Sequence, residues 1–79
     1  MTAAQLEVLG QLAGAVDLPA RSIARARGVE ERVAYRTIDA LIRRNHVTVL
    51  WSFGREQFAI TEKGRRHLAR ELARLQVTA

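Results

Sequence analysis

Two arginines one helical turn apart, Arg32 and Arg36, are the residues of this sequence best suited to bind another molecule. A guanidinium group presents a planar fork of donors that fits phosphate oxygens and guanine edges. At 100° per residue, both lie on one narrow arc of a helix predicted over residues 30–44, and Asp39 and Arg43 share that arc. The opposite face of the same helix carries Ala34, Thr37, Ile38 and Leu41. Burial of that apolar face would project the arginines into solvent.

Two interpretations of this basic face remain open. The arginines could contact bases or phosphates of nucleic acid in a major groove. They could instead form a solvated face, in which Arg36 pairs with Asp39 and Asp39 pairs with Arg43. Tyr35 lies on the flank, where it could touch nucleic acid or pack against the segment that follows.

Charge and composition favour a nucleic-acid partner over catalysis. The 79 residues include 13 basic and 8 acidic side chains, for a net charge of +5, and all but Lys63 of the basic residues are arginine. The codon usage of a GC-rich genome would explain the ratio of arginine to lysine, but not the net charge. The sequence shows no paired carboxylates, nucleophile–base pair, phosphate loop or metal set, so we expect neither an enzyme nor a cofactor.

The length predicts a single domain over residues 1–79 whose stability is marginal. There are no cysteines to form disulfides or thiolate metal sites, and His46 and His67 have no cluster of further ligands around them. A partner subunit is therefore the expected source of extra stability. Neither a signal peptide nor a membrane span is visible, which predicts a soluble, cytoplasmic domain.

Helical periodicity and caps predict two helices before the basic one. Thr2 and Gln5 form a capping box for a helix over residues 3–15. Its apolar face is predicted to comprise Leu6, Leu9, Leu12, Ala13 and Val16. A short helix over residues 19–27 follows, with Pro19 in its first turn. Gly28 supplies the positive φ of a tight turn, and Asn45 is suited to end the helix over residues 30–44 in the left-handed region.

The periodicity then changes to that of a β-hairpin. Residues 47–51 and 56–60 are rich in β-branched and aromatic side chains, and the four-residue connection between them contains glycine. Thr61 caps a last helix over residues 62–76. That helix carries a narrow stripe of Leu68, Leu72 and Leu75, and cations on its other face: Lys63, Arg66, Arg70 and Arg74.

Several side chains have simple expected environments. Trp51 and Phe58 are predicted to fill the core beneath the hairpin rather than to stack on bases. Phe53 at the turn is hard to bury and would anchor the hairpin or contact a partner. We expect His46 and His67 to be ordinary polar positions. Arg25 and Arg27 are predicted to be solvated.

Two helices joined by a glycine turn, the second with a basic outer face, form a helix-turn-helix arrangement. The stretch LPARSIARARGVEERVAYRTIDALIRRNHVTV and the ending FAITEKGRR resemble winged helix-turn-helix transcription regulators, especially the MarR-like and PadR-like groups. The resemblance covers about residues 17–68. It implies a mostly α fold with a small β-hairpin as the wing, and double-stranded DNA as the partner.

The resemblance also implies which residues contact DNA: Arg32, Tyr35, Arg36 and Arg43 on the recognition helix, Arg55 at the wing tip, and Arg21 and Ser22 at the start of the second helix. The sequence departs from the family pattern at Glu30 and Glu31, where Ser, Thr or Asp usually caps the recognition helix. These carboxylates suit a helix N-terminus but would oppose DNA phosphates.

The leading hypothesis is a small sequence-specific regulator that binds an inverted repeat as a homodimer through its terminal helices. The alternative is a protein-interaction module whose basic surface binds an acidic partner, which Glu30 and Glu31 favour. A small-molecule effector is not identifiable from the sequence.

Overall fold

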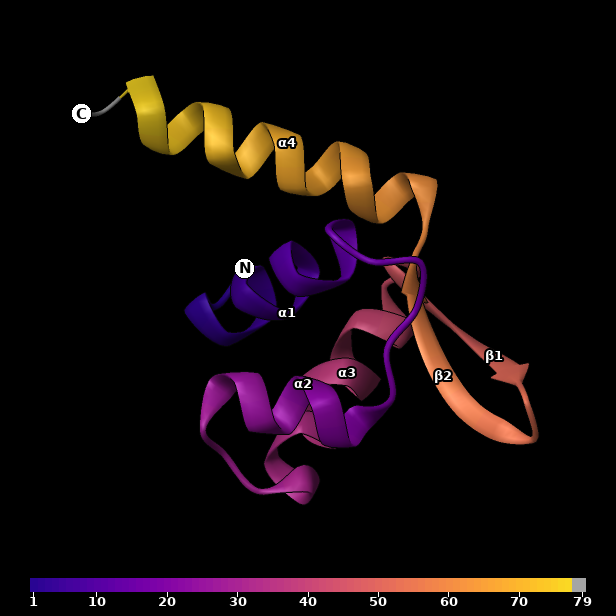
Figure 1. The fold of residues 1–79 in the computed structure, drawn as a ribbon. Helices are drawn as coiled ribbons and strands as arrows, with labels where there is room; N and C mark the ends of the chain where they lie inside the picture. The colour runs from indigo at the N-terminus through magenta and orange to yellow at the C-terminus, as the bar shows by residue number, and fades with distance from the viewer. Residues whose placement is uncertain (78–79) are drawn as a thin grey trace.

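Four helices and one β-hairpin follow one another in the predicted order in the computed structural model, which describes residues 1–77. The helices are α1 (Ala3–Ala13), α2 (Ala20–Arg27), α3 (Glu31–Arg43) and α4 (Glu62–Val77). Strands β1 (Val47–Ser52) and β2 (Arg55–Ile60) form the antiparallel wing between α3 and α4 (Figure 1). The predicted mostly α architecture with a small hairpin is confirmed.

The core joins α1, α2 and α3 to the base of the wing. Its fully buried large side chains are Val8, Leu9, Leu12, Ile23, Ile38, Leu41 and Phe58. The predicted apolar face of α3 is thus buried, with Ala34 beside Ile38 and Leu41. This packing fixes the rotation of α3 about its axis and so determines which of its residues face outward.

α1 begins as predicted and ends earlier. The hydroxyl of Thr2 accepts from the Gln5 amide at 3.1 Å, and the Gln5 side chain accepts from the Thr2 amide at 3.3 Å. The helix ends at Ala13, where Gly14 is the C-cap, so the predicted end at Ala15 is wrong. Val16 is consequently 89% exposed and does not extend the apolar face. Glycine favours this early end because it stabilises a helix poorly.

The segment after α1 pairs with the wing instead. The Leu18 amide donates to the Phe58 carbonyl at 2.9 Å, and the Phe58 amide donates to the Leu18 carbonyl at 2.8 Å. The Gln57 side chain also donates to Asp17 at 2.7 Å. These bonds hold β2 against the entry to α2. Pro19 is the N-cap of α2 rather than its first helical residue, because its ψ of 158° is extended.

The turns at both ends of α3 use left-handed residues, as predicted. Gly28 has a φ of 68° between α2 and α3, and Asn45 has a φ of 62° after α3. Non-glycine residues in this region are mostly asparagine or aspartate, because their short polar side chains tolerate it. The two turns set the direction in which α3 enters and leaves the core.

The wing has a tighter turn than predicted. Ser52 pairs with Arg55, so the connection has two residues, Phe53 and Gly54, rather than four. Both have positive φ, 54° and 72°. Two-residue turns of this kind match the right-handed twist of the strands they join, which lets pairing extend to the end of the hairpin.

The predicted burial of Phe58 is confirmed, and that of Trp51 is wrong. Phe58 is 2% exposed and Trp51 is 73% exposed. Cross-strand partners share a face of a hairpin, and Trp51 pairs with Glu56 as Val49 pairs with Phe58. Trp51 therefore lies on the inner face, but beyond the point where the helices cover it.

The start of α4 packs closely against the loop that follows α3. The Thr61 hydroxyl accepts from the Gly64 amide at 3.0 Å, which confirms the predicted cap, and donates to the Asn45 carbonyl at 2.6 Å. Gly64 is buried against the backbone carbonyl of His46, so a Cβ at position 64 would clash with it. Of the predicted leucine stripe, Leu68 is buried, whereas Leu72 and Leu75 are about half exposed.

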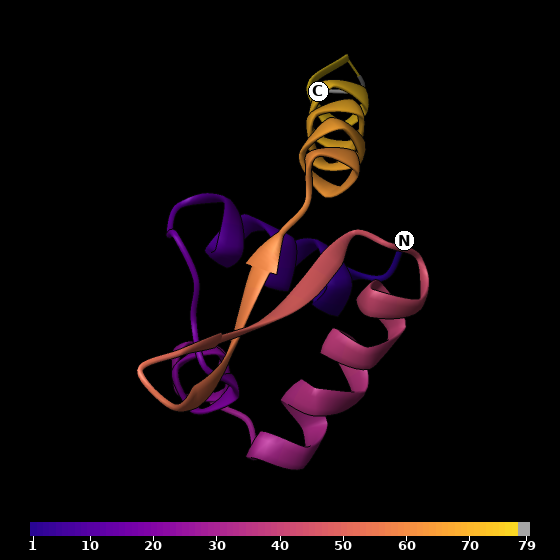
Figure 2. The ribbon, with the colours of Figure 1, turned by 90° about the vertical axis from the view of Figure 1, so that its right-hand side faces the viewer.

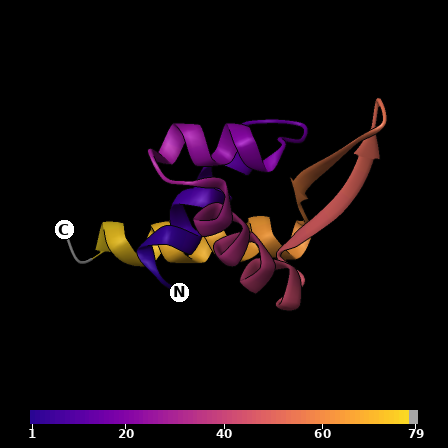
Figure 3. The ribbon, with the colours of Figure 1, turned by 90° about the horizontal axis from the view of Figure 1, so that it is seen from below.

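The views agree on how these elements are arranged. α4 lies at the top of Figures 1 and 2, while the start of α3 and the wing tip lie toward the bottom. Seen from below, in Figure 3, the wing extends away from the helices, in a direction different from that of α3. Within residues 1–77, none of the helices is long and apolar enough to cross a membrane.

Candidate nucleic-acid interface

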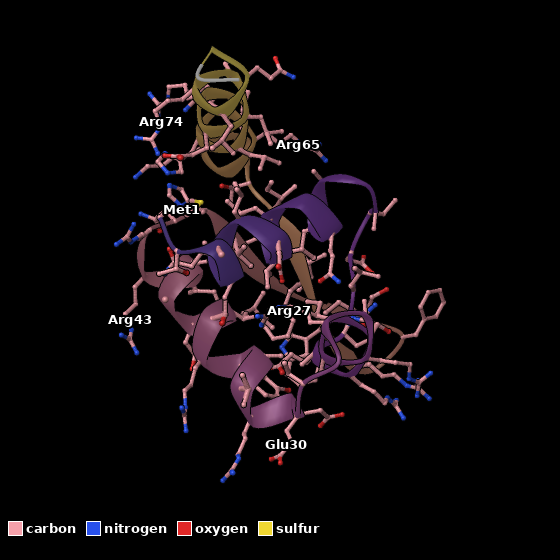
Figure 4. The ribbon with its side chains drawn as sticks, turned by 90° about the vertical axis from the view of Figure 1, so that its left-hand side faces the viewer. Met1, Arg27, Glu30, Arg43, Arg65 and Arg74 are labelled. Carbon is pink, nitrogen blue, oxygen red and sulfur yellow. The ribbon has the colours of Figure 1, made fainter. Side chains whose placement is uncertain are left out.

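The outer face of α3 is open to solvent. The Arg32 side chain is 75% exposed, and Arg36, Asp39 and Arg43 are all exposed. Arg43 and Glu30 point away from the body in Figure 4. The other described residues, 1–77, therefore leave the arginine face uncovered, which is the geometry that groove binding requires.

The ion pairs on this face differ from those that the solvated-face interpretation would require. Within residues 1–77 no ion pair joins Asp39 to Arg36 or Arg43. Arg32 instead pairs with Glu30 at 2.9 Å, just before the start of α3. Pairs this exposed contribute about 0–1 kcal/mol, so a phosphate could displace Glu30 at little energetic cost.

Tyr35 links α3 to the wing. Its hydroxyl donates to a Glu56 carboxylate oxygen at 2.9 Å, and its ring meets Phe58 edge-on with centroids 6.0 Å apart. The hydrogen bond to Glu56, followed by burial, raises the pKa of the Tyr35 phenol. Packing against the wing, one of the two predicted roles, is thus what the structure shows. A phosphate contact by the hydroxyl would compete with Glu56.

Three of the predicted residues flank α3 on neighbouring elements. Arg21 and Ser22 are exposed in the first turn of α2, whose N-cap makes no side-chain cap bond. Arg55 is exposed beside the wing turn. An open hollow of about 290 Å³ lies between α2, α3 and the wing. Its lining includes Arg21 of α2, Glu31 and Tyr35 of α3, and Trp51, Arg55 and Glu56 of the wing. Arg43 stands apart, at the other end of α3.

Arg27 belongs to the framework, and its predicted solvation is wrong. Its side chain is 12% exposed, and its Nε donates to a Glu7 carboxylate oxygen at 3.2 Å. Figure 4 shows Arg27 turned into the body between α1 and α2. Arg25, by contrast, is exposed as predicted. Glu7 and Arg27 are twenty residues apart, and no local sequence pattern marks them as partners.

His46 and His67 form a stacked pair that the sequence did not reveal. Their ring centroids lie 4.6 Å apart with an interplanar angle of 18°. His46 is 5% exposed, so its expected role as an ordinary polar position is wrong. Burial, and then the nearby His67 and Lys63, lower the pKa of His46. The pair joins the loop after α3 to α4.

Comparison with known proteins gives a consistent result at the level of structure. No family model matches the chain, and no curated protein sequence matches it either. The PcaV transcriptional regulator from Streptomyces coelicolor superposes with a TM-score of 0.88 at 23% identity. A MarR family protein from Bacillus stearothermophilus superposes with a TM-score of 0.89 at 18% identity. The chain therefore has the winged-helix fold of these solved structures.

The matched region is nearly all of this chain but only part of each solved structure. The match with PcaV covers 96% of this chain and 56% of that protein. The match with the Bacillus protein covers 99% and 56%. BpsR from Bordetella bronchiseptica, at 22% identity and a TM-score of 0.85, matches 99% of this chain and 58% of its own. The chain thus spans little more than half the length of these regulators.

Proposed function

We propose that this chain is a sequence-specific DNA-binding domain whose α3 enters the major groove. The observation that carries this proposal is the open face of Arg32, Arg36 and Arg43, opposite the fully buried Ile38 and Leu41. The core holds the helix in one orientation, so its guanidinium groups project together. A major groove admits one α-helix, and its flanking phosphates attract cations.

The flanking elements support the same partner. The N-terminus of α2 has no side-chain cap, and a helix N-terminus favours a phosphate through its free amides and its dipole. Arg21 and Ser22 lie beside it, and Arg55 lies at the wing tip. Regulation of DNA binding by 6-hydroxynicotinic acid has been described for BpsR, which has this fold.

The two acidic residues at the start of α3 also have structural roles in the helix. Glu30 is the N-cap of α3, and Arg32 neutralises it at 2.9 Å. Glu31 lies in the first turn, where its carboxylate stabilises the helix by interacting with the positive end of the helix dipole. A phosphate or base that takes Arg32 would leave Glu30 unpaired, so the two carboxylates still oppose this partner.

We also propose that the chain acts as a homodimer on an inverted repeat, assembled through its terminal helices. Leu72 and Leu75 are 46% and 51% exposed on α4, and a second copy would cover them. Half-sites would then lie about one helical turn apart. Sedimentation at micromolar concentration tests this assembly, and a monomer with and without DNA would contradict it.

The decisive experiment selects bound duplexes from a random DNA library and then compares two matched variants. Arg32→Ala and Arg66→Ala each remove one cation from an exposed pair, with Glu30 at 2.9 Å and with Glu62 at 3.3 Å. Arg32→Ala should weaken binding by about 1–3 kcal/mol if it reads a base, whereas Arg66→Ala on α4 should not.

Salt dependence and the wild type complete the test. If Arg32 contacts a phosphate, its loss should reduce the slope of log affinity against log salt by about 1. Wild-type protein that binds no duplex even at low salt would contradict DNA binding. An acidic protein partner would then be the remaining explanation of the basic face.

A further inference from the structure

Phe53 at the tip of the wing is covered by no other residue of the described chain. Its side chain is 100% exposed, the largest exposed fraction among the large hydrophobic residues of the described chain. It occupies the first position of the two-residue turn, with a φ of 54°, and Gly54 follows with a φ of 72°.

Neither the turn nor the core explains a phenylalanine there. A turn with positive φ at both central positions favours Asn-Gly, and a bulky side chain in the left-handed region is strained. An apolar side chain outside the core also gains nothing from burial. Phe53 therefore destabilises the turn slightly without a compensating contact inside the molecule, which directs attention to a contact outside it.

The surroundings of the tip indicate a polyanion. Arg55 is exposed directly after the turn, and Arg21 lines the hollow that Arg55 and Trp51 also line. The nearest wing carboxylate, Glu56, is held on the inner face by the Tyr35 hydroxyl. The tip also lies toward the same end of the molecule as the start of α3 (Figure 2).

We propose that Phe53 is an apolar wedge that enters the minor groove of the DNA bound by α3 and partly unstacks one base step. This inference rests on the proposed function and adds a specificity that base contacts do not provide. Apolar wedges kink the duplex where unstacking is easiest, so bound sites should carry a flexible TA or CA/TG step beneath the wing. Arg55 would hold the adjacent backbone.

The experiment uses the full chain and the duplexes recovered by selection, with 2-aminopurine placed at successive steps outside the α3 site. Wild type should increase its fluorescence at one step, and Phe53→Ala should abolish that increase and weaken binding roughly tenfold. Phe53→Leu keeps an apolar wedge and should retain most of both signals. Val16→Ala removes another exposed apolar side chain, 89% exposed in the loop before α2, and should change neither.

A second variant separates binding from folding. Phe53→Asn installs the residue that the turn prefers, so it should raise the midpoint of unfolding while it weakens DNA binding. Wild type that binds duplex as tightly as Phe53→Ala and Phe53→Asn, with no fluorescence change, would overturn the wedge and leave the proposed function intact. Binding of wild type, but not of Phe53→Ala, to anionic lipid vesicles with no effect on DNA would also overturn it. Wild type that binds no duplex would overturn both proposals.

Discussion

The base and the tip of the wing share one strand pattern and differ in what surrounds them. On the inner face, Val47 is 2% exposed, Val49 39% and Trp51 73%. All three point to the same side, because alternate residues of a strand do. The alternation of residues along the strand thus determines which face of the hairpin a side chain lies on. Whether that side chain is buried depends on how far the helices extend along the hairpin. Apolar residues at the base belong to the core, and those at the tip are available to a partner.

The largest expected effect tests the base of the wing. Phe58→Ala removes a ring that is 2% exposed and should lower the free energy of unfolding by about 3–5 kcal/mol. Trp51→Ala, on the same face, should change it by less than about 0.5 kcal/mol. Denaturant titration measures both. Equal losses would show that the base and the tip are a single packing unit.

The contact between α4 and the residue just before β1 gives the next largest effect on stability. Gly64→Ala places a Cβ against the His46 carbonyl and the Ile60 side chain, so it should destabilise the fold by about 1–3 kcal/mol. Gly10→Ala is the control, since nothing lies within 4 Å of its added Cβ. It should stabilise α1 by roughly 1 kcal/mol. A Gly64→Ala variant as stable as wild type would mean that this contact is loose.

The histidine at the base predicts a pH effect that the tip does not share. The pKa of His46 is lowered from 6.5 in the folded protein, so the unfolded chain takes up the proton first as the pH falls. Stability from neutral His46 is therefore full above about pH 6.5 and is lost as the pH falls through the folded pKa. His67, Lys63, Arg44 and Arg70 oppose its protonation, whereas Glu71 lies 3.8 Å from His67.

Unfolding of wild type and His46→Gln at several values between about pH 7.5 and 5.5 measures this effect. The variant should show a flatter profile than wild type. Parallel profiles would assign the pH dependence to other groups.

The smallest effect concerns the link between α3 and the wing. Tyr35→Phe removes the hydrogen bond to Glu56 and keeps the ring against Phe58, so it should cost about 0.5–1 kcal/mol. If that bond also orients the wing, Tyr35→Phe should weaken DNA binding more than it weakens folding. If Tyr35→Phe lowers stability but leaves DNA affinity unchanged, the role of Tyr35 is confined to packing against the wing.

Sequence patterns predicted those features of the fold that depend on neighbours along the chain. The Thr2 capping box, the Gly28 and Asn45 turns and the Thr61 cap all formed, because each needs only residues within one turn. The periodicity of α3 predicted which of its faces is buried. Burial of that face leaves the predicted arginines exposed on the opposite one.

Features that depend on distant segments were not predictable in this way. The Arg27–Glu7 pair, the stacked histidines and the bridge between Leu18 and Phe58 each join segments at least twenty residues apart. Trp51 was placed on the correct face and given the wrong burial, because a strand pattern does not say how far the helices extend. The assignment of DNA contacts to all seven site residues stays a prediction: Arg21, Ser22, Arg32, Tyr35, Arg36, Arg43 and Arg55.

The pairing of Leu18 with Phe58 has a consequence for self-association. An open strand edge is a template for strands of other molecules, and the wing exposes apolar side chains beside its edges. Two backbone hydrogen bonds, at 2.9 and 2.8 Å, occupy the outer edge of β2 at Phe58. A foreign strand could extend the sheet past that point only by displacing the segment that leads into α2. The β2 edge of the wing is therefore less able to pair with a strand of another molecule.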